Sequence, residues 1–76
     1  MNKQRRSTIK TAMLHIEKAV ELIQDVKYEE QDALDNMPEN LQNSERYEAM
    51  ENAIDSLEDA LDGIEDVKDC LDRAVA

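Results

Sequence analysis

The chain has 76 residues, a formal net charge of −10, 37% charged residues and 3% aromatic residues. A chain of this length forms one domain at most, and its core is so small that assembly, a metal or disulfides usually add stability. The single cysteine excludes an intrachain disulfide, and with one histidine it provides neither a metal cluster nor a nucleophile pair. We therefore expect a single domain over residues 1–76 that is stabilised by assembly, without a cofactor, a metal ligand or a catalytic residue.

The charge is distributed unevenly along the chain. Residues 1–27 carry six basic and three acidic side chains, whereas residues 28–76 carry three basic and sixteen acidic ones. The net negative charge repels phosphate, so we expect no direct nucleic-acid partner and no membrane partner. Apolar runs are short and no hydrophobic segment follows the basic start, which predicts a cytoplasmic protein. One Gly, one Pro, no Trp and no Phe leave little with which to build a substrate pocket, so we do not expect an enzyme.

The first predicted element is a helix over about residues 4–35. Its apolar residues recur at seven-residue spacing, which is typical of a helix packed along one face. They are Ile9, Ile16 and Ile23, beside Ala12, Ala19 and Val26, with Met13 and Val20 widening the stripe. His15 lies next to this stripe and is interpreted as a surface or boundary residue.

A connection over about residues 36–43 follows, and it is longer than a simple reversal needs. Pro38 pushes Met37 toward extended backbone and is well placed to begin a short helical turn that ends at Leu41. Asn43 or Ser44 is suited to cap the next helix. We expect Leu41 to fold back and close the end of the core.

The second predicted helix covers about residues 44–75 and carries a two-position heptad seam. Small residues run beside this seam, and small residues let helices approach closely. The seam positions are Tyr47, Ile54, Leu61, Lys68 and Val75, alternating with Met50, Leu57, Ile64 and Leu71; the small row is Ala53, Ala60, Val67 and Ala74, with Gly63 and Cys70 one step further round. The predicted fold is therefore all-α, an antiparallel coiled-coil-like hairpin of which two copies form a dimeric four-helix bundle.

Three features of the second helix have two interpretations. Its carboxylates, from Glu51 to Asp72, form either a solvated face or a surface that mimics nucleic acid. Lys68, in an otherwise apolar seam, either selects the helix register or extends its ammonium group to solvent. Cys70 lies among acidic residues that disfavour a thiolate, so a packing role is preferred to a reactive one.

The connection contains one residue that chain reversal does not explain. Arg46 lies in the first turn of a helix, where a positive charge opposes the helix dipole, so it needs a carboxylate or an external anion. Tyr28 and Tyr47 flank the connection, and we expect a hairpin to bring them to the same end. The predicted binding residues are Arg5, Arg6, Tyr28, Asn36, Glu39, Arg46 and Tyr47. The alternative for the tyrosines and Arg46 is a structural role, as core-closing rings and an internal ion pair.

The run EEQDALDNMPENLQNSERYEAMENAIDSLEDALDGIED, with the basic opening NKQRR, resembles small acidic all-helical proteins from Gram-positive bacteria and their phages. The shared features are a Met-Pro-Glu or Leu-Pro-Glu turn, a Ser-Glu-Arg start to the second helix and a heptad tail. The resemblance implies no activity. If the chain is phage-encoded, it implies interference with a host process.

Three functions remain open at this stage. The first is a small oligomeric helical protein that binds an unidentified host protein through the turn end and the basic N-terminus. The second is an inhibitor that offers its carboxylates to a nucleic-acid-binding protein. The third is a binder of a small anionic ligand such as a nucleotide, with Arg5, Arg6 and Arg46 contacting phosphate and the tyrosines contacting the base.

Overall fold

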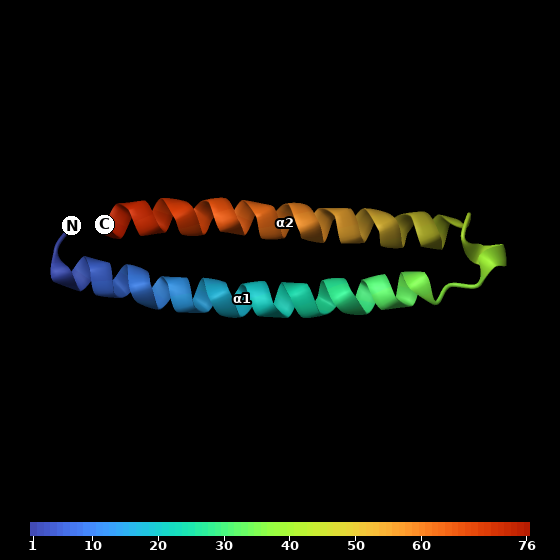
Figure 1. Cartoon of the computed structure of the whole chain (residues 1–76), viewed down its shortest axis with the longest axis horizontal. Helices are drawn as coiled ribbons and strands as arrows, with labels where there is room; N and C mark the ends of the chain where they lie inside the picture. Colours follow the sequence, from blue (N-terminus) through green and yellow to red (C-terminus); the bar gives the residue numbers. More distant parts are fainter.

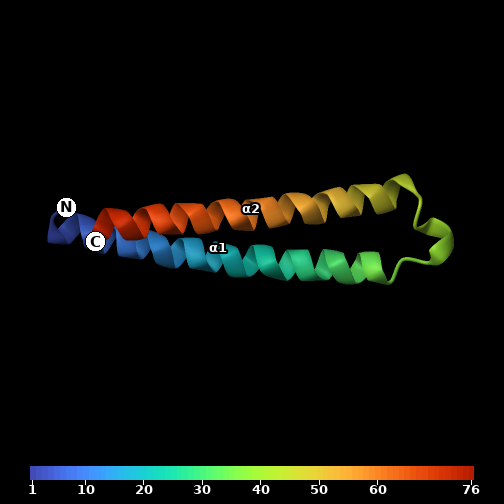
Figure 2. The ribbon, with the colours of Figure 1, turned by 45° about the horizontal axis from the view of Figure 1, so that its top comes forward.

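The computed structural model describes residues 1–76 and consists of two long helices joined by a short connection. Helix α1 spans Lys3–Asp35, a single 3-10 turn η1 spans Glu39–Leu41, and helix α2 spans Glu45–Val75. The two helices run antiparallel, and both chain termini lie at the end opposite the connection (Figure 1, Figure 2). The predicted all-α hairpin is confirmed. Neither helix contains an apolar stretch of the length needed to cross a bilayer.

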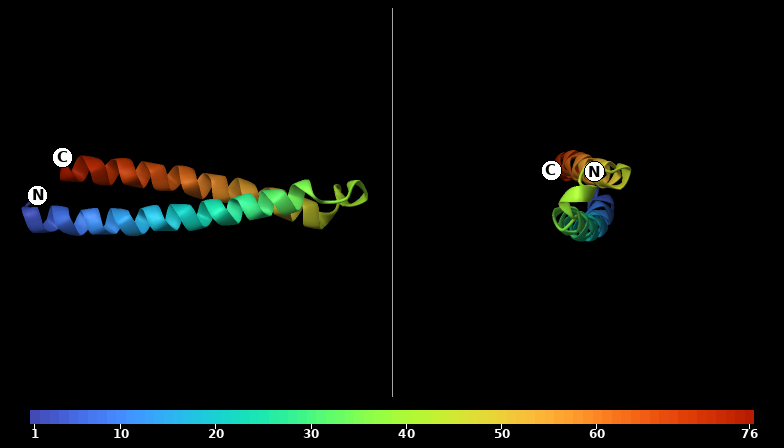
Figure 3. Two further views of the ribbon diagram at one scale, coloured as in Figure 1. Left: turned by 60° about the horizontal axis from the view of Figure 1, so that its bottom comes forward. Right: turned by 90° about the vertical axis from the view of Figure 1, so that its right-hand side faces the viewer.

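The hairpin is a thin rod. Its principal extents are 59, 15 and 13 Å, and viewed end-on it is a single pair of helices (Figure 3). Its radius of gyration is 17.4 Å, against about 11 Å for a compact domain of this length. It exposes 5855 Å², whereas a compact monomer of this mass exposes about 4,700 Å². A lone hairpin therefore leaves about 1,100 Å² more surface in water than a compact fold would.

The helices meet along a heptad seam. Its members are buried or half-buried and recur at alternating three- and four-residue intervals, which defines positions a and d of each helix. All nine seam positions predicted for the second helix are among them. The seam of α1 consists of Ile9, Met13, Ile16, Val20, Ile23, Lys27, Glu30 and Leu34, and the seam of α2 of Tyr47, Met50, Ile54, Leu57, Leu61, Ile64, Lys68, Leu71 and Val75.

The best-packed part of the seam is at the turn end. Leu34, Met50 and Ile54 are the three buried residues of the chain, and Met37 and Tyr47 pack against them. Leu41, which we expected to close this end, is instead 44% exposed. Leu41 contributes to the turn through its backbone. The carbonyl of Leu41 accepts hydrogen bonds from the backbone N–H and the hydroxyl of Ser44.

Three charged residues occupy seam positions. Lys27 Nζ lies 3.4 Å from Glu58 Oε1, the one ion pair between the helices. Lys68 Nζ lies 3.3 Å from Glu65 Oε1 within α2, so its ammonium group turns to the helix surface, one of the two interpretations above. Glu30, like Lys27, was not anticipated in the seam. Such partly exposed pairs contribute about 1 kcal/mol at most, so they do not replace the apolar packing that these positions lack.

Candidate functional site

The connection is held by hydrogen bonds to its own backbone. Asn36 ends α1, where its backbone N–H and its side-chain Nδ2 both donate to the carbonyl of Asp32. Of the two predicted caps for α2, the structure selects Ser44, whose Oγ accepts from the N–H of Tyr47 at 3.2 Å. Pro38 immediately precedes the 3-10 turn, close to its predicted place. Asn36 therefore has a structural role in the turn, and the side chain of Glu39 projects from it into solvent.

Arg46 is exposed at the start of α2 and lies in no ion pair. It is flanked by Glu45 and Glu48, the acidic residues that complement the dipole in the first turn of this helix. The internal ion pair considered from the sequence is therefore not formed. Its guanidinium group is free to bind an external carboxylate or phosphate.

The two tyrosines do not share a site. Tyr47 is half-buried against the core cluster, whereas Tyr28 is 64% exposed on α1. The ion pair of Lys27 with Glu58 sets Tyr28 level with the middle of α2. Eleven residues of helix separate Glu58 from Tyr47, which is about 16 Å. The expectation that Tyr28 joins Tyr47 at the turn end is corrected, because Tyr28 lies two helical turns before the end of α1.

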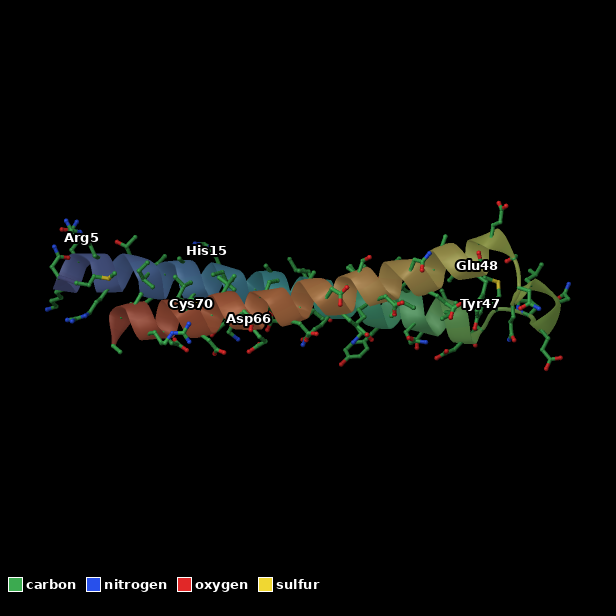
Figure 4. The ribbon with its side chains drawn as sticks, turned by 90° about the horizontal axis from the view of Figure 1, so that it is seen from above. Arg5, His15, Tyr47, Glu48, Asp66 and Cys70 are labelled. Carbon is green, nitrogen blue, oxygen red and sulfur yellow. The ribbon has the colours of Figure 1, made fainter.

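The basic N-terminus lies at the far end of the rod. Arg5 is near the chain termini, while Tyr47 and Glu48 are at the turn end (Figure 4). The backbone N–H of Arg5 donates to Asn2 Oδ1 at 2.8 Å, which caps α1, and the side chains of Arg5 and Arg6 are exposed. Within one hairpin, Arg5 and Arg6 therefore cannot act with Arg46 and Tyr47.

The two flanks of the seam differ in chemistry. In an antiparallel coil, the e positions of both helices line one edge and the g positions line the other. The e positions here form a polar flank, which consists of Lys10, Glu17, Gln24, Gln31, Glu51, Glu58, Glu65 and Asp72. The g positions from the second heptad onward form an apolar flank, which consists of Ala12, Ala19, Val26, Ala33, Ala53, Ala60, Val67 and Ala74.

The apolar flank is largely open to water. Val26 is 50% exposed and Val67 is 48% exposed, and Leu22, one step further round α1, is 54% exposed. Val26 lies beside the seam, as expected from its place beside the predicted stripe, and the seam itself passes through Lys27. The sequence showed the small row of the second helix and, in Ala12, Ala19 and Val26, three residues of the matching row of the first helix; only the register of the seam showed that the two rows lie on the same side.

Gly63 lies one step round α2 from the apolar flank, in the middle of an exposed helix. Its φ is not positive, and a Cβ added to it would meet no atom within 4 Å. Nothing in the hairpin requires glycine there, although glycine in a helix interior costs about 0.5–1 kcal/mol relative to alanine.

The remaining candidates are His15, Cys70, and a possible pocket or metal site. His15 is exposed, as predicted. Cys70 is exposed with Arg73 Nη2 at 3.2 Å from its Sγ, so it does not pack inside the hairpin. The surface has no pocket, since two helices alone cannot enclose one, and its carboxylates form no group suited to a metal ion.

Comparison with protein-family models, with curated proteins and with solved structures gave no match for this chain.

Proposed function

We propose that this protein acts by binding another polypeptide, as a small oligomeric helical protein whose assembled form is a dimeric four-helix bundle. The observation that carries the proposal is the apolar flank, which runs along both helices and is exposed in a single hairpin except at Ala12 and Ala19, which are half-buried. Exposed apolar surface of this extent marks interaction sites on small proteins. The large exposed area of the hairpin and its charged seam positions support the same proposal.

The surface proposed for a partner other than a second copy is the turn end. It presents the exposed guanidinium group of Arg46, which lies in no ion pair, and the exposed carboxylate of Glu39; Tyr47, the next residue in the sequence, is half-buried against the core. Arginine and tyrosine are the residues most enriched among those that dominate binding energy at interfaces. If the chain is phage-encoded, the proposed partner is a host protein.

The test compares three tagged baits in one lysate, with mass spectrometry of captured proteins and small molecules. We expect the original chain to retain a partner that the Arg46→Ala variant loses, while the Lys18→Ala variant retains it. Lys18 is a suitable control because it is exposed and distant from the turn, and its pair with Glu21 is a surface one. Melting curves of all three must coincide. Identical captures by the Arg46 and Lys18 variants would contradict a role for the turn end.

A second candidate function is inhibition of a nucleic-acid-binding protein, with the carboxylates of α2 imitating the negative charges of nucleic acid. It is favoured by one observation: of the exposed acidic residues of α2, only Glu58 and Glu65 pair with a lysine. Binding through such a surface weakens steeply as salt rises, because the attraction is between exposed charges. A captured partner that is released by moderate salt, and that still binds the Arg46→Ala variant, would identify this function.

A further inference from the structure

We propose that a second copy of this chain packs head to tail on the apolar flank, so that the two α2 helices cross near Gly63. The inference rests on the proposed homodimer and specifies the surface and the orientation that it uses. The occupant is another copy of this chain, which brings an identical apolar flank to the contact.

The composition of the two flanks identifies the contacting side. The e and g positions of a two-helix coil in water usually carry charged residues. The polar flank follows that rule, whereas every position of the apolar flank is alanine or valine. Side chains of this size allow two helices to pack at short distance, and the exposed Leu22 adds apolar area on the same side.

The position of Gly63 indicates where the two α2 helices cross. This residue is the one glycine of the chain and lies one step round α2 from the middle of the row of small residues. Alanine would favour the helix and would fit the hairpin without a clash. Close approach of a second backbone explains why a residue without a side chain occupies this position.

The size of the face suits a stable dimer. The rod has extents of 59 and 15 Å, so the side that carries the apolar flank has an area on the order of 900 Å². Standard interfaces bury about 800 Å² per partner. The dimer would therefore cover most of the additional surface that the rod exposes.

Charge determines the orientation. A section across the rod at Gly63 passes close to Val20 of α1. The part toward the termini, residues 1–20 and 64–76, has seven basic and five acidic side chains, while the part toward the turn, residues 21–63, has two basic and fourteen acidic ones. Copies aligned with their turns together would juxtapose the two acidic parts. Copies aligned head to tail place each acidic part against the mildly basic part of the other.

The positions of some of these charges along α1 are consistent with this orientation. Its first turn has no acidic residue and its last turn no basic one. Lys3, Arg5 and Arg6 lie at the positive end of the helix dipole, and Asp32 and Asp35 lie at the negative end, so both groups oppose the dipole. A charge gradient that does not stabilise its own helix is explained by attraction to a second copy. In this pairing Arg5 and Arg6 of one copy approach the turn that carries Arg46 of the other.

The surface is tested by placing leucine on either side of α2. Gly63→Leu puts a bulky side chain on the proposed contact, and Asn52→Leu puts the same side chain on the outward face. Light scattering across a concentration series should show a dimer for the original chain and for Asn52→Leu. Gly63→Leu should raise the dissociation constant by at least about tenfold, as overpacking at a close contact does, with helicity by circular dichroism unchanged or higher.

The outcomes separate the two proposals. A monomeric original chain at tens of micromolar would overturn both the proposed assembly and this inference. A dimer that survives Gly63→Leu, or that dissociates equally with Asn52→Leu, would leave the assembly standing and overturn the contact surface.

Orientation is tested with single cysteines in a Cys70→Ser background. In a head-to-tail pair crossing near Gly63, Ala60→Cys places two thiols about 9 Å apart along the helix axis. Ala53→Cys leaves its two thiols about 30 Å apart along the helix axis. Even the shorter offset is too large for a disulfide, so a short bis-maleimide reagent is used, and it should crosslink the first variant and not the second. Failure of Ala60→Cys to crosslink while light scattering shows a dimer, or equal crosslinking of both variants, would overturn the head-to-tail arrangement.

Discussion

At the scale of single residues, the two helix starts show how a side chain sets an element boundary. Asn2 and Ser44 both have extended backbone, and each accepts a hydrogen bond from the N–H three residues later. A helix start leaves several N–H groups without partners, so a side-chain acceptor at this position stabilises the helix. The neighbouring Asn43 has the same capacity but is exposed and caps nothing.

This difference gives a prediction about the cap. Ser44→Ala should destabilise the protein by about 1 kcal/mol, because the N–H of Tyr47 loses its partner and the hydroxyl no longer donates to the carbonyl of Leu41. In a domain of this size that is a fall in melting temperature of about 4–8 °C. Asn43→Ala is the matched control and should melt close to the original chain. The reverse order of the two variants in thermal melts would contradict the assignment of the cap.

At the scale of the helices, the seam and the outward faces divide the leucines into two classes. Leu57 is half-buried between the helices, whereas Leu14 is 67% exposed on the outside of α1. The same substitution therefore has different consequences at the two positions. Only the seam leucine loses contacts when it becomes polar, and only there does a new carboxylate have to be removed from water.

Leu57→Asp should unfold the hairpin and dissociate the assembly together, as should Ile64→Asp in the same seam, since each change costs about 3 kcal/mol or more. Leu14→Asp should leave both the circular dichroism spectrum and the mass from light scattering unchanged. If Leu57→Asp and Leu14→Asp melted at the same temperature, the seam identified from burial would be wrong.

At the scale of the whole molecule, net charge opposes compactness. The chain carries a formal charge of −10 and has a sequence pI near 4.3, and only three of its lysines lie in ion pairs. Repulsion among exposed carboxylates is long-ranged at low ionic strength and is screened as salt is added. The rod shape lessens this repulsion by spreading the charge over its length, but two copies bring the charges closer together.

We therefore expect the melting temperature to rise when the sodium chloride concentration is increased from low to moderate. We also expect it to rise on mild acidification, which makes the net charge less negative. A combined Asp55→Asn, Asp62→Asn and Asp69→Asn variant, which changes the formal charge from −10 to −7 on the outward face of α2, should melt higher at low salt and respond less to salt. Equal salt responses of the two proteins would show that this repulsion does not limit stability.

The sequence by itself determined the helical architecture. The seven-residue spacing from Ile9 to Ile23 and from Tyr47 to Val75 specifies one packing face on each helix, and this local periodicity needs no tertiary information. The breaks in the pattern at Pro38 and Ser44 located the connection for the same reason. The candidate site was less predictable, since the sequence placed Arg46 and Tyr47 at the turn end but also assigned Tyr28 to them.

Only the tertiary structure decided the register between the helices, and the register controls what a surface contains. It placed Lys27 and Glu30 in the seam, set Tyr28 level with Glu58, and left Leu41 exposed. It also aligned the alanine and valine rows of two different helices along one flank. The physical reason is that periodicity defines a face within one helix. The relation between the faces of two helices depends on the axial offset and the rotation with which the helices pack against each other.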